Sequence, residues 1–212
     1  MFEQILGVFF PDICVGCGVR GCLLCEECRR GLPQASPAEH PWITSLFAYQ
    51  DSRVRSLIKK IKFKNTRHGV DVFAEALARA VTEYVGEETL MIGERTLLLV
   101  PIPLSKKRAK LRGYNQSELV ARKMLRYLDR DRFRIDTKLL VKEIETTAQS
   151  DIKKKSERLA NLGSCFRATR GSRGECIILI DDVTTTGATL GAARSSLRAA
   201  HFTHVHAFTI AH

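Results

Sequence analysis

Residues 177–190, which read IILIDDVTTTGATL, constrain the fold more than any other stretch of this sequence. The leading apolar run is typical of a strand buried on both faces, and such strands belong to parallel sheets. Two aspartates follow at once, and four threonines and a glycine occupy the next seven positions. Carboxylates placed at the end of a buried strand are costly unless something binds there. The stretch therefore predicts a buried strand, a binding loop and a helix that begins near Leu190.

Strand and helix patterns alternate from residue 42 onward, which predicts an α/β fold with a mainly parallel sheet. The expected strands are 42–50, 97–103, 139–142, 176–180 and 203–211, and the expected helices are a short one within 26–32, then 52–63, 71–85, 115–128 and one from Leu190. Residues 32–41 hold three prolines and few apolar side chains, which is typical of a linker. We therefore expect a small N-terminal unit at 1–33 and a larger domain at 42–212.

Five of the seven cysteines lie within residues 14–28, which read CVGCGVRGCLLCEEC. In a cytosolic protein, clustered Cys-x-x-Cys pairs favour a metal over disulfides. Two such pairs suit a tetrahedral, structural Zn²⁺ site, because four thiolates leave no open position for chemistry. The predicted ligands are Cys14, Cys17, Cys25 and Cys28. Cys22 also forms a Cys-x-x-Cys pair with Cys25, so the spacing leaves its role open, and a redox dithiol is the competing interpretation.

The charge balance points to anionic partners. The 212 residues include 34 Lys and Arg against 23 Asp and Glu, a net charge of +11. Residues 52–70 hold seven basic side chains and no acidic one, and residues 101–134 hold eleven basic and three acidic. Such surfaces attract the phosphates of a small ligand or of a nucleic acid, although each run can also be a plain solvated face.

The sequence favours a cytoplasmic protein without stable membrane insertion. Its longest apolar runs are too short to span a bilayer. The N-terminal stretch MFEQILGVFF lacks the basic region and the small-residue cleavage site of a signal peptide.

The loop after the two aspartates has the chemistry of a phosphate site. A helix N-terminus presents unpaired N–H groups, threonine hydroxyls add donors, and Gly187 lets the backbone approach an anion. Asp181 and Asp182 would repel that phosphate, so a sugar must separate the two: carboxylates accept hydrogen bonds from vicinal hydroxyls and attract divalent cations. The residues thus predict a ribose 5-phosphate ligand. The Walker and Gly-x-Gly-x-x-Gly patterns are absent.

The same motif resembles the phosphoribosyl pyrophosphate (PRPP) binding motif of the type I phosphoribosyltransferases. Residues 100–121, VPIPLSKKRAKLRGYNQSELVA, and the spacing of Gln149, Arg158 and Asn161 before GSCF narrow the resemblance further. Together with the N-terminal cysteines, these features resemble the ComF family of competence-associated proteins over essentially the whole chain. Tyr114 stands in RGYNQS where the family usually has Phe.

This resemblance implies the type I phosphoribosyltransferase fold with a small N-terminal zinc finger. It also implies that the two aspartates contact the ribose hydroxyls and organise Mg²⁺, and that the threonine loop holds the 5-phosphate. Arg108 and Arg112 would meet the pyrophosphate. The implied PRPP-binding set is Asp181, Asp182, Val183, Thr184, Thr185, Thr186, Gly187, Ala188, Thr189, Arg108 and Arg112. The polar residues 143–163 would form a catalytic loop over the ligand, with Arg158 joining the two aspartates as the catalytic set.

The family further implies a role in natural competence, with PRPP, incoming single-stranded DNA and other competence proteins, such as a DNA-uptake helicase, as partners. Aromatic side chains are scarce in the basic stretches, so DNA contact would depend on backbone charge. An active enzyme would transfer a pentosyl group from PRPP, but no acceptor signature is present, so activity is left open. The alternatives are a small-molecule phosphoribosyltransferase of nucleotide salvage and a non-catalytic PRPP sensor.

Overall fold

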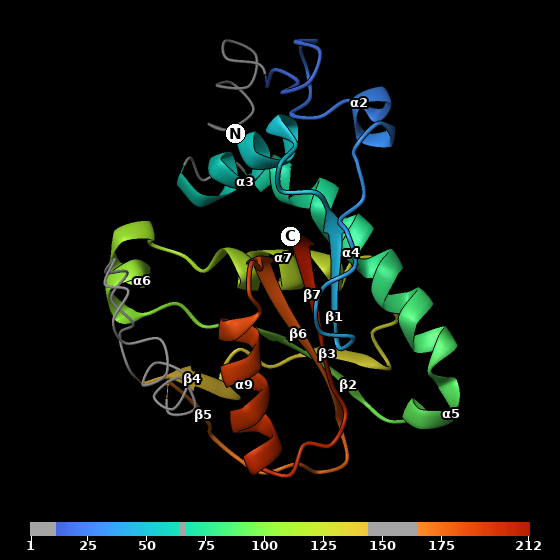
Figure 1. Cartoon of the computed structure of the whole chain (residues 1–212), viewed down its shortest axis with the longest axis vertical. Helices are drawn as coiled ribbons and strands as arrows, with labels where there is room; N and C mark the ends of the chain where they lie inside the picture. Colours follow the sequence, from blue (N-terminus) through green and yellow to red (C-terminus); the bar gives the residue numbers. More distant parts are fainter. Residues whose placement is uncertain (1–11, 64–66, 144–164) are drawn as a thin grey trace.

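A computed structural model describes residues 12–63, 67–143 and 165–212. Its main sheet has five parallel strands in the order β1-β7-β6-β2-β3, which confirms the predicted α/β class (Figure 1). The strands are β1 (Ile43–Phe47), β2 (Leu97–Pro101), β3 (Phe133–Ile135), β6 (Cys176–Val183) and β7 (Val205–Ala211). An antiparallel pair, β4 (Leu140–Lys142) and β5 (Phe166–Ala168), forms a second, small sheet.

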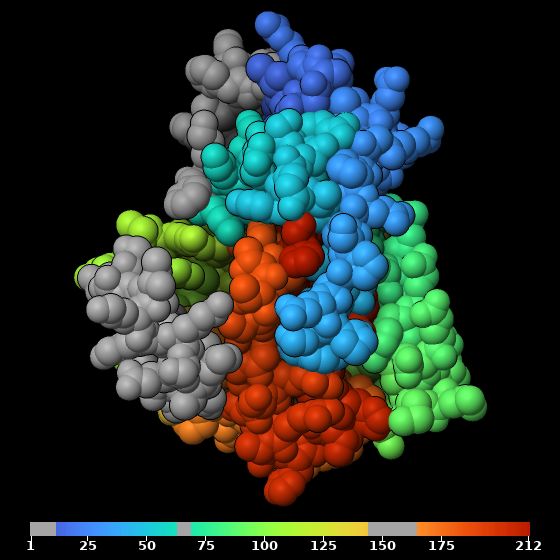
Figure 2. Space-filling model, in the orientation of Figure 1, coloured from blue at the N-terminus to red at the C-terminus, as the bar shows by residue number. Residues whose placement is uncertain are grey.

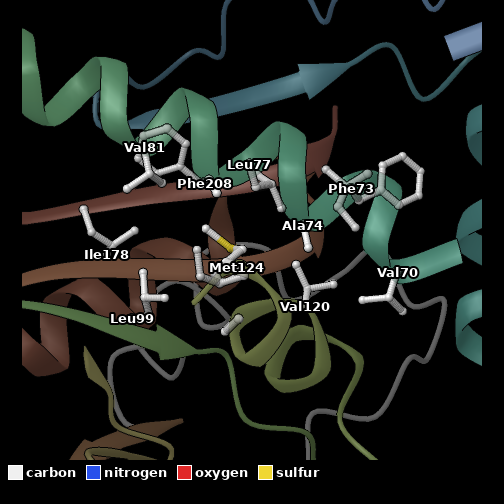
Figure 3. Close-up of a cluster of buried hydrophobic side chains, with 14 of the residues drawn as sticks. Val70, Phe73, Ala74, Leu77, Val81, Leu99, Val120, Met124, Ile178 and Phe208 are labelled. Atoms are coloured by element: carbon white, nitrogen blue, oxygen red, sulfur yellow. The ribbon is translucent and has the colours of Figure 1, made fainter. Parts of the chain in front are cut away.

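Helices cover both faces of the main sheet. They are α2 (Glu26–Arg30), α3 (Ser52–Phe63), α4 (Arg67–Glu87), α5 (Thr89–Ile92), α6 (Lys106–Arg112), α7 (Gln116–Met124) and α9 (Ala188–Ala199). The alternate residues Ile178 and Ile180 of β6 pack with α4 and α7, whereas Ile177 and Leu179 pack with α9. Figure 3 shows the first of these cores, in which α4 and α7 lie over the strands. Burial on both faces explains why β6 is a continuous apolar run.

Within the described residues, the sequence patterns missed four elements: β3, β5, α5 and α6. Apart from Leu111, which is 79% exposed, α6 presents basic side chains and alanine, so it has no apolar periodicity. Its ends are marked instead: Ser105 accepts a hydrogen bond from the Arg108 amide at 3.4 Å, and Gly113 ends the helix at φ 74°.

The other helices lie close to their expected ranges. Asn115 caps α7 as predicted, since its side chain accepts from the Ser117 amide, but the helix ends at Met124 rather than at residue 128. α4 extends beyond the expected 71–85, and α9 begins two residues earlier than expected, directly after Gly187.

The N-terminal segment packs on α3 and α4 at one end of the molecule (Figure 2). Leu23, Leu24 and Leu32 are buried in the same core as the apolar face of α3. An ion pair of 2.8 Å joins Arg29 to Glu75 of α4. The predicted linker 32–41 lies along the edge of β1, where backbone hydrogen bonds of 3.0 and 2.9 Å connect the two segments.

Crossing a bilayer needs a long apolar helix, and none of the helices in the described part of the chain qualifies.

Candidate functional site

The sheet topology places the two aspartates where a ligand site is expected. The chain leaves β2 toward β3 on one side and leaves β6 toward β7 on the other, so the strand order reverses between β2 and β6. In such sheets ligands bind beyond the carboxyl ends of the strands at the reversal point. Asp181 and Asp182 stand there, and the Ile102 amide donates to the Ile180 carbonyl at 2.9 Å, so the loop after β2 begins beside them.

Both carboxylates have hydrogen-bond donors from the start of α7. The Ser117 hydroxyl donates to Asp181 Oδ1 at 3.0 Å, and Gln116 Nε2 donates to Asp182 Oδ2 at 3.0 Å. Lys62, in the last turn of α3, places its ammonium 3.0 Å from the same Asp182 oxygen. Gln116 and Ser117 are only 2% exposed, so these contacts are shielded from water. The acidic pair is therefore held in a fixed position by α7 and α3.

The electrostatics of the pair favour a bound cation. Burial, together with the adjacent Asp182 carboxylate, raises the pKa of Asp181 to about 7, although hydrogen bonds from the Asp182 amide and Ser117 and the charge of Lys62 oppose this effect. Two adjacent carboxylates form the oxygen-rich donor set that Mg²⁺ prefers. The residues therefore fit a divalent ion.

The acidic pair lines a cavity of about 270 Å³ with basic residues around it. The two arginines singled out from the sequence, Arg108 and Arg112 of α6, lie on its wall, as do Val183 and Thr189. Among the described residues, its charged lining consists of Asp181, Asp182, Lys62, Arg108, Arg112 and Lys142. Four cationic and two anionic side chains leave a formal charge of +2, which suits an anionic ligand.

Lys142, at the end of β4, is part of this basic wall. Its ammonium lies 5.3 Å from the ring centre of Phe166. Burial and the neighbouring charge of Arg108 lower the pKa of Lys142. A bound anion would stabilise the charged form of Lys142, because it would compensate the positive potential of the cavity wall.

The threonine loop connects β6 to α9 beside the same cavity. Gly187 precedes α9 with φ 70°, a left-handed conformation that favours glycine. Thr184 is buried, and its amide donates to Ala211 at 3.0 Å; Thr185 and Thr186 are exposed. Thr189 reaches the cavity wall, whereas residues 184–188 are not among the lining residues. The loop thus presents exposed threonines and the N-terminus of a twelve-residue helix.

Arg158 and most of the predicted catalytic loop fall within 144–164, outside the described residues. The sequence reasoning missed four residues that surround the acidic pair: Gln116, Ser117, Lys62 and Lys142. The first two belong to the quoted RGYNQS motif, so the motif carried a usable signal. Lys142 had no such signal. Lys62 is one of seven basic residues in the stretch 52–70, and nothing in the sequence distinguishes it from the other six.

The four predicted cysteine ligands come together. The sulfur atoms of Cys14, Cys17, Cys25 and Cys28 all lie within 4.8 Å of one another. The sulfurs of Cys17 and Cys25 are 3.6 Å apart, close to the spacing of about 3.8 Å that a tetrahedral ion with Zn–S bonds of about 2.3 Å imposes. The cluster can hold a structural metal such as Zn²⁺. Cys22 is not part of this cluster, which resolves the alternative pairing.

The environment of Cys14 suits a thiolate ligand. Although burial acts to raise the pKa of Cys14, hydrogen bonds from backbone amides lower it to about 6. Two of these amides, Gly16 and Cys25, lie 3.4 Å from the sulfur. Cysteine binds a metal as the thiolate, so these backbone hydrogen bonds favour the form of Cys14 that can act as a ligand.

Comparison with known proteins gives several relatives, while no family model matches the chain. Competence protein ComFC of Bacillus subtilis (strain 168) is 31% identical over 169 residues, which cover 78% of this chain and 62% of that protein. DNA utilization protein YhgH of Salmonella typhimurium is 30% identical over 183 residues, with 79% of this chain and 74% of the relative covered. Competence protein ComFC of Streptococcus pneumoniae is 28% identical, with 88% and 74% covered.

The chain spans less than two thirds of the Bacillus subtilis relative, but about three quarters of the other two. The similarity extends over most of this chain, and the four-cysteine cluster fits the N-terminal zinc finger that the sequence predicted. On these grounds the chain belongs to the ComF family.

Proposed function

We propose that this protein binds PRPP together with Mg²⁺ at the acidic pair and takes part in DNA uptake, where it handles incoming single-stranded DNA. The observation that supports this ligand is the lining of one cavity: it includes Asp181 and Asp182, Thr189 at the start of α9 directly after the threonine loop, and Arg108 and Arg112 of α6. PRPP has a phosphate, two vicinal hydroxyls and a pyrophosphate, and each matches one of these groups.

Mg²⁺ would be held by the acidic pair, where it supplies charge neutralisation for the pyrophosphate. The protein's own residues do the positioning. Ser117 and Gln116 hold the two carboxylates, which line the cavity. Arg108 and Arg112 offer planar, permanently charged groups that bind phosphate oxygens in pairs. If an acceptor attacks the ribose, the same arginines stabilise the charge that develops on the departing pyrophosphate.

The DNA role is supported by the names of the relatives, which are competence and DNA utilization proteins, and by the basic surface of this chain. Residues 106–112 place five basic side chains on one short helix at the rim of the cavity. Tyr127, in the turn that follows the C-terminal end of α7, is 47% exposed and offers a surface for base stacking. Contact would be mainly electrostatic and independent of sequence.

Calorimetric titration tests the ligand. PRPP with Mg²⁺ is titrated into the wild type, into an Asp181→Asn/Asp182→Asn double variant and into Asp129→Asn/Asp131→Asn, which removes two carboxylates before β3. We expect binding by the wild type and the control and none by the first variant. Equal binding by all three proteins would exclude the acidic pair as the site.

The DNA role is tested by fluorescence anisotropy with a labelled single-stranded oligonucleotide at several salt concentrations. Contact with several phosphates predicts a steep, linear fall of log affinity with log salt. Turnover of a free base with PRPP, without DNA binding at any salt, would favour nucleotide salvage instead. Binding of PRPP without DNA binding and without turnover would favour a sensor.

A further inference from the structure

Lys62 contributes a charge to the cavity although it belongs to a helix of the N-terminal end of the molecule. Its ammonium lies 3.0 Å from Asp182 Oδ2, and its side chain is 21% exposed. It also lines the cavity together with Arg108, Arg112 and Lys142. In the structure described here, Lys62 is the cation nearest to Asp182 and competes for the oxygen that a divalent ion would use.

A divalent ion on the acidic pair changes the partner that Lys62 needs. The ion competes for the Asp182 oxygen and repels the ammonium, so the ammonium must turn away. The cavity wall around it is otherwise basic, so an anionic group of the ligand is the partner that compensates its charge. Lysine suits this exchange, because it is a point charge on a flexible stem and can turn without losing a paired geometry.

The start of α3 is attached to the four-cysteine cluster. The Arg53 guanidinium donates to the Cys28 carbonyl at 3.3 Å and to the Gly31 carbonyl at 2.7 Å, while it is paired with Asp51 at 2.7 Å. A β-carbon added at Gly16 would lie 2.5 Å from the Cys28 sulfur and 3.2 Å from Arg53 Cδ, so the arginine packs directly against the knuckle. Arg53 is therefore the link between a cysteine ligand and this helix.

The other end of α3 is fixed at the cavity. The Tyr114 hydroxyl donates a hydrogen bond to the Ile61 carbonyl, one residue before Lys62. Tyr114 lies just before Gln116 and Ser117, which bind the two aspartates. The same segment therefore contacts both the C-terminal end of α3 and the acidic pair. Between the ends, Val54, Leu57, Ile58 and Ile61 are at most 2% exposed. Nine residues of helix make a rigid connection of roughly 14 Å from Arg53 to Lys62.

From these contacts we propose that Lys62 is a further ligand-binding residue of the site, which contacts the diphosphate of the bound ligand, and that Arg53 positions it by fastening α3 to the metal-binding knuckle. This inference rests on the proposed binding of PRPP and adds to it a residue and a structural dependence: the affinity of the cavity for diphosphate depends on the attachment of α3 to the cysteine cluster.

The first test compares Lys62→Met with Lys59→Met by calorimetric titration with PRPP and, separately, with inorganic pyrophosphate, both with Mg²⁺. Lys59 is exposed on the same helix, so its variant removes the same charge outside the cavity. We expect Lys62→Met to bind both anions about ten- to a hundredfold more weakly than the wild type, with Lys62→Arg partly restored and Lys59→Met nearly unchanged. Equal affinities of the Lys62→Met and Lys59→Met variants would overturn the inference.

The second test is a double-mutant cycle that keeps the metal in place. Arg53→Met should weaken binding in the wild-type background, with zinc content and thermal unfolding measured to show that the fold is retained, whereas Arg55→Met on the exposed side of α3 should not. In the Lys62→Met background, Arg53→Met should have little additional effect, because it acts through Lys62. Additive losses would show that Arg53 does not position Lys62.

The two anions separate this inference from the proposed function. If the wild type binds pyrophosphate but not PRPP, the proposed function fails, and Lys62 is judged on pyrophosphate alone. If PRPP binds and Lys62→Met has no effect, the proposed function stands and the inference fails. A folded, metal-loaded wild type that binds neither anion overturns both.

Discussion

Nε2 of Gln116, the first residue of α7, donates a hydrogen bond of 3.0 Å to Oδ2 of Asp182, at the end of β6. The next residue along the helix, Ser117, donates in the same way to Asp181. Two consecutive residues of a helix N-terminus thus match two consecutive carboxylates, where the helix dipole also favours negative charge. Among the described side chains, the Gln116 carbonyl oxygen is one of the few buried atoms without a partner, so it can accept from a ligand hydroxyl.

The raised pKa of Asp181 predicts a pH-dependent cost to stability. Its carboxyl stays protonated up to about pH 7 in the folded protein, whereas in the unfolded chain it ionises near 3.8. The folded state therefore binds the extra proton between these values, and stability falls as pH rises through this window. We expect Asp181→Asn to raise the free energy of unfolding by about 1–3 kcal/mol at pH 8 and to change it little below pH 4.

Thermal or urea unfolding across this pH range measures the effect of Asp181→Asn, with Asp131→Asn in an exposed loop as the control. A variant whose stability relative to the wild type is the same at pH 4 and pH 8 would contradict a raised pKa.

Ser117→Ala should shift the pH profile of ligand binding. The serine hydroxyl stabilises the ionised form of Asp181, so its loss raises the pKa of this carboxyl further. If Mg²⁺ needs the carboxylate, affinity for PRPP with Mg²⁺ rises with pH through about 7 in the wild type and at a higher pH in the variant. Titrations at several pH values check this, with Ser195→Ala on the exposed side of α9 as the control. An unshifted midpoint would show that the hydroxyl does not tune Asp181.

Gly187→Ala should damage both the fold and the loop. Gly187 has φ 70°, and an added β-carbon would lie 3.0 Å from both His40 Cδ2 and Ile43 Cδ1. We expect a loss of about 1–2 kcal/mol of stability and strongly weakened PRPP binding. Gly191→Ala is the matched control: it lies inside α9 with open space around its β-carbon and should stabilise the helix by about 0.5–1 kcal/mol. Denaturant unfolding and calorimetry of both variants test this, and similar behaviour of the two would contradict the strain argument.

Gly16→Ala should release the metal. The added β-carbon would be 2.5 Å from the Cys28 sulfur and 3.0 Å from its β-carbon, so the second knuckle must move. We expect lower zinc content after purification and a lower melting temperature. Gly86→Ala, where α4 leaves open space, should keep the metal and be neutral or slightly stabilising. Metal analysis and thermal unfolding measure both effects. Full zinc retention by Gly16→Ala would contradict the assigned geometry of the cluster.

The sequence determined the features that depend on local order along the chain. A buried strand followed by two acids and a threonine loop fixed the class of sheet and the place of the acidic pair, because strand, loop and helix signals follow one another directly. The spacing of Cys14, Cys17, Cys25 and Cys28 predicted the four sulfurs that come together, since each two-residue spacer brings its pair to one side, but it left the role of Cys22 open.

The tertiary structure alone decided which distant residues meet. Lys62 and Lys142 are ordinary basic residues in the sequence, and they become part of the site only because α3 and β4 end at the cavity. It also decided that Cys22 stays outside the cluster, since the four sulfurs that converge are those of Cys14, Cys17, Cys25 and Cys28. Helix α6 was not predicted because it buries no apolar face, and its ends are defined by the capping residues Ser105 and Gly113. Hydrophobic periodicity identifies the face that a single segment buries. The residues of a polar site come from different segments, and only the packing of those segments against one another brings their side chains together.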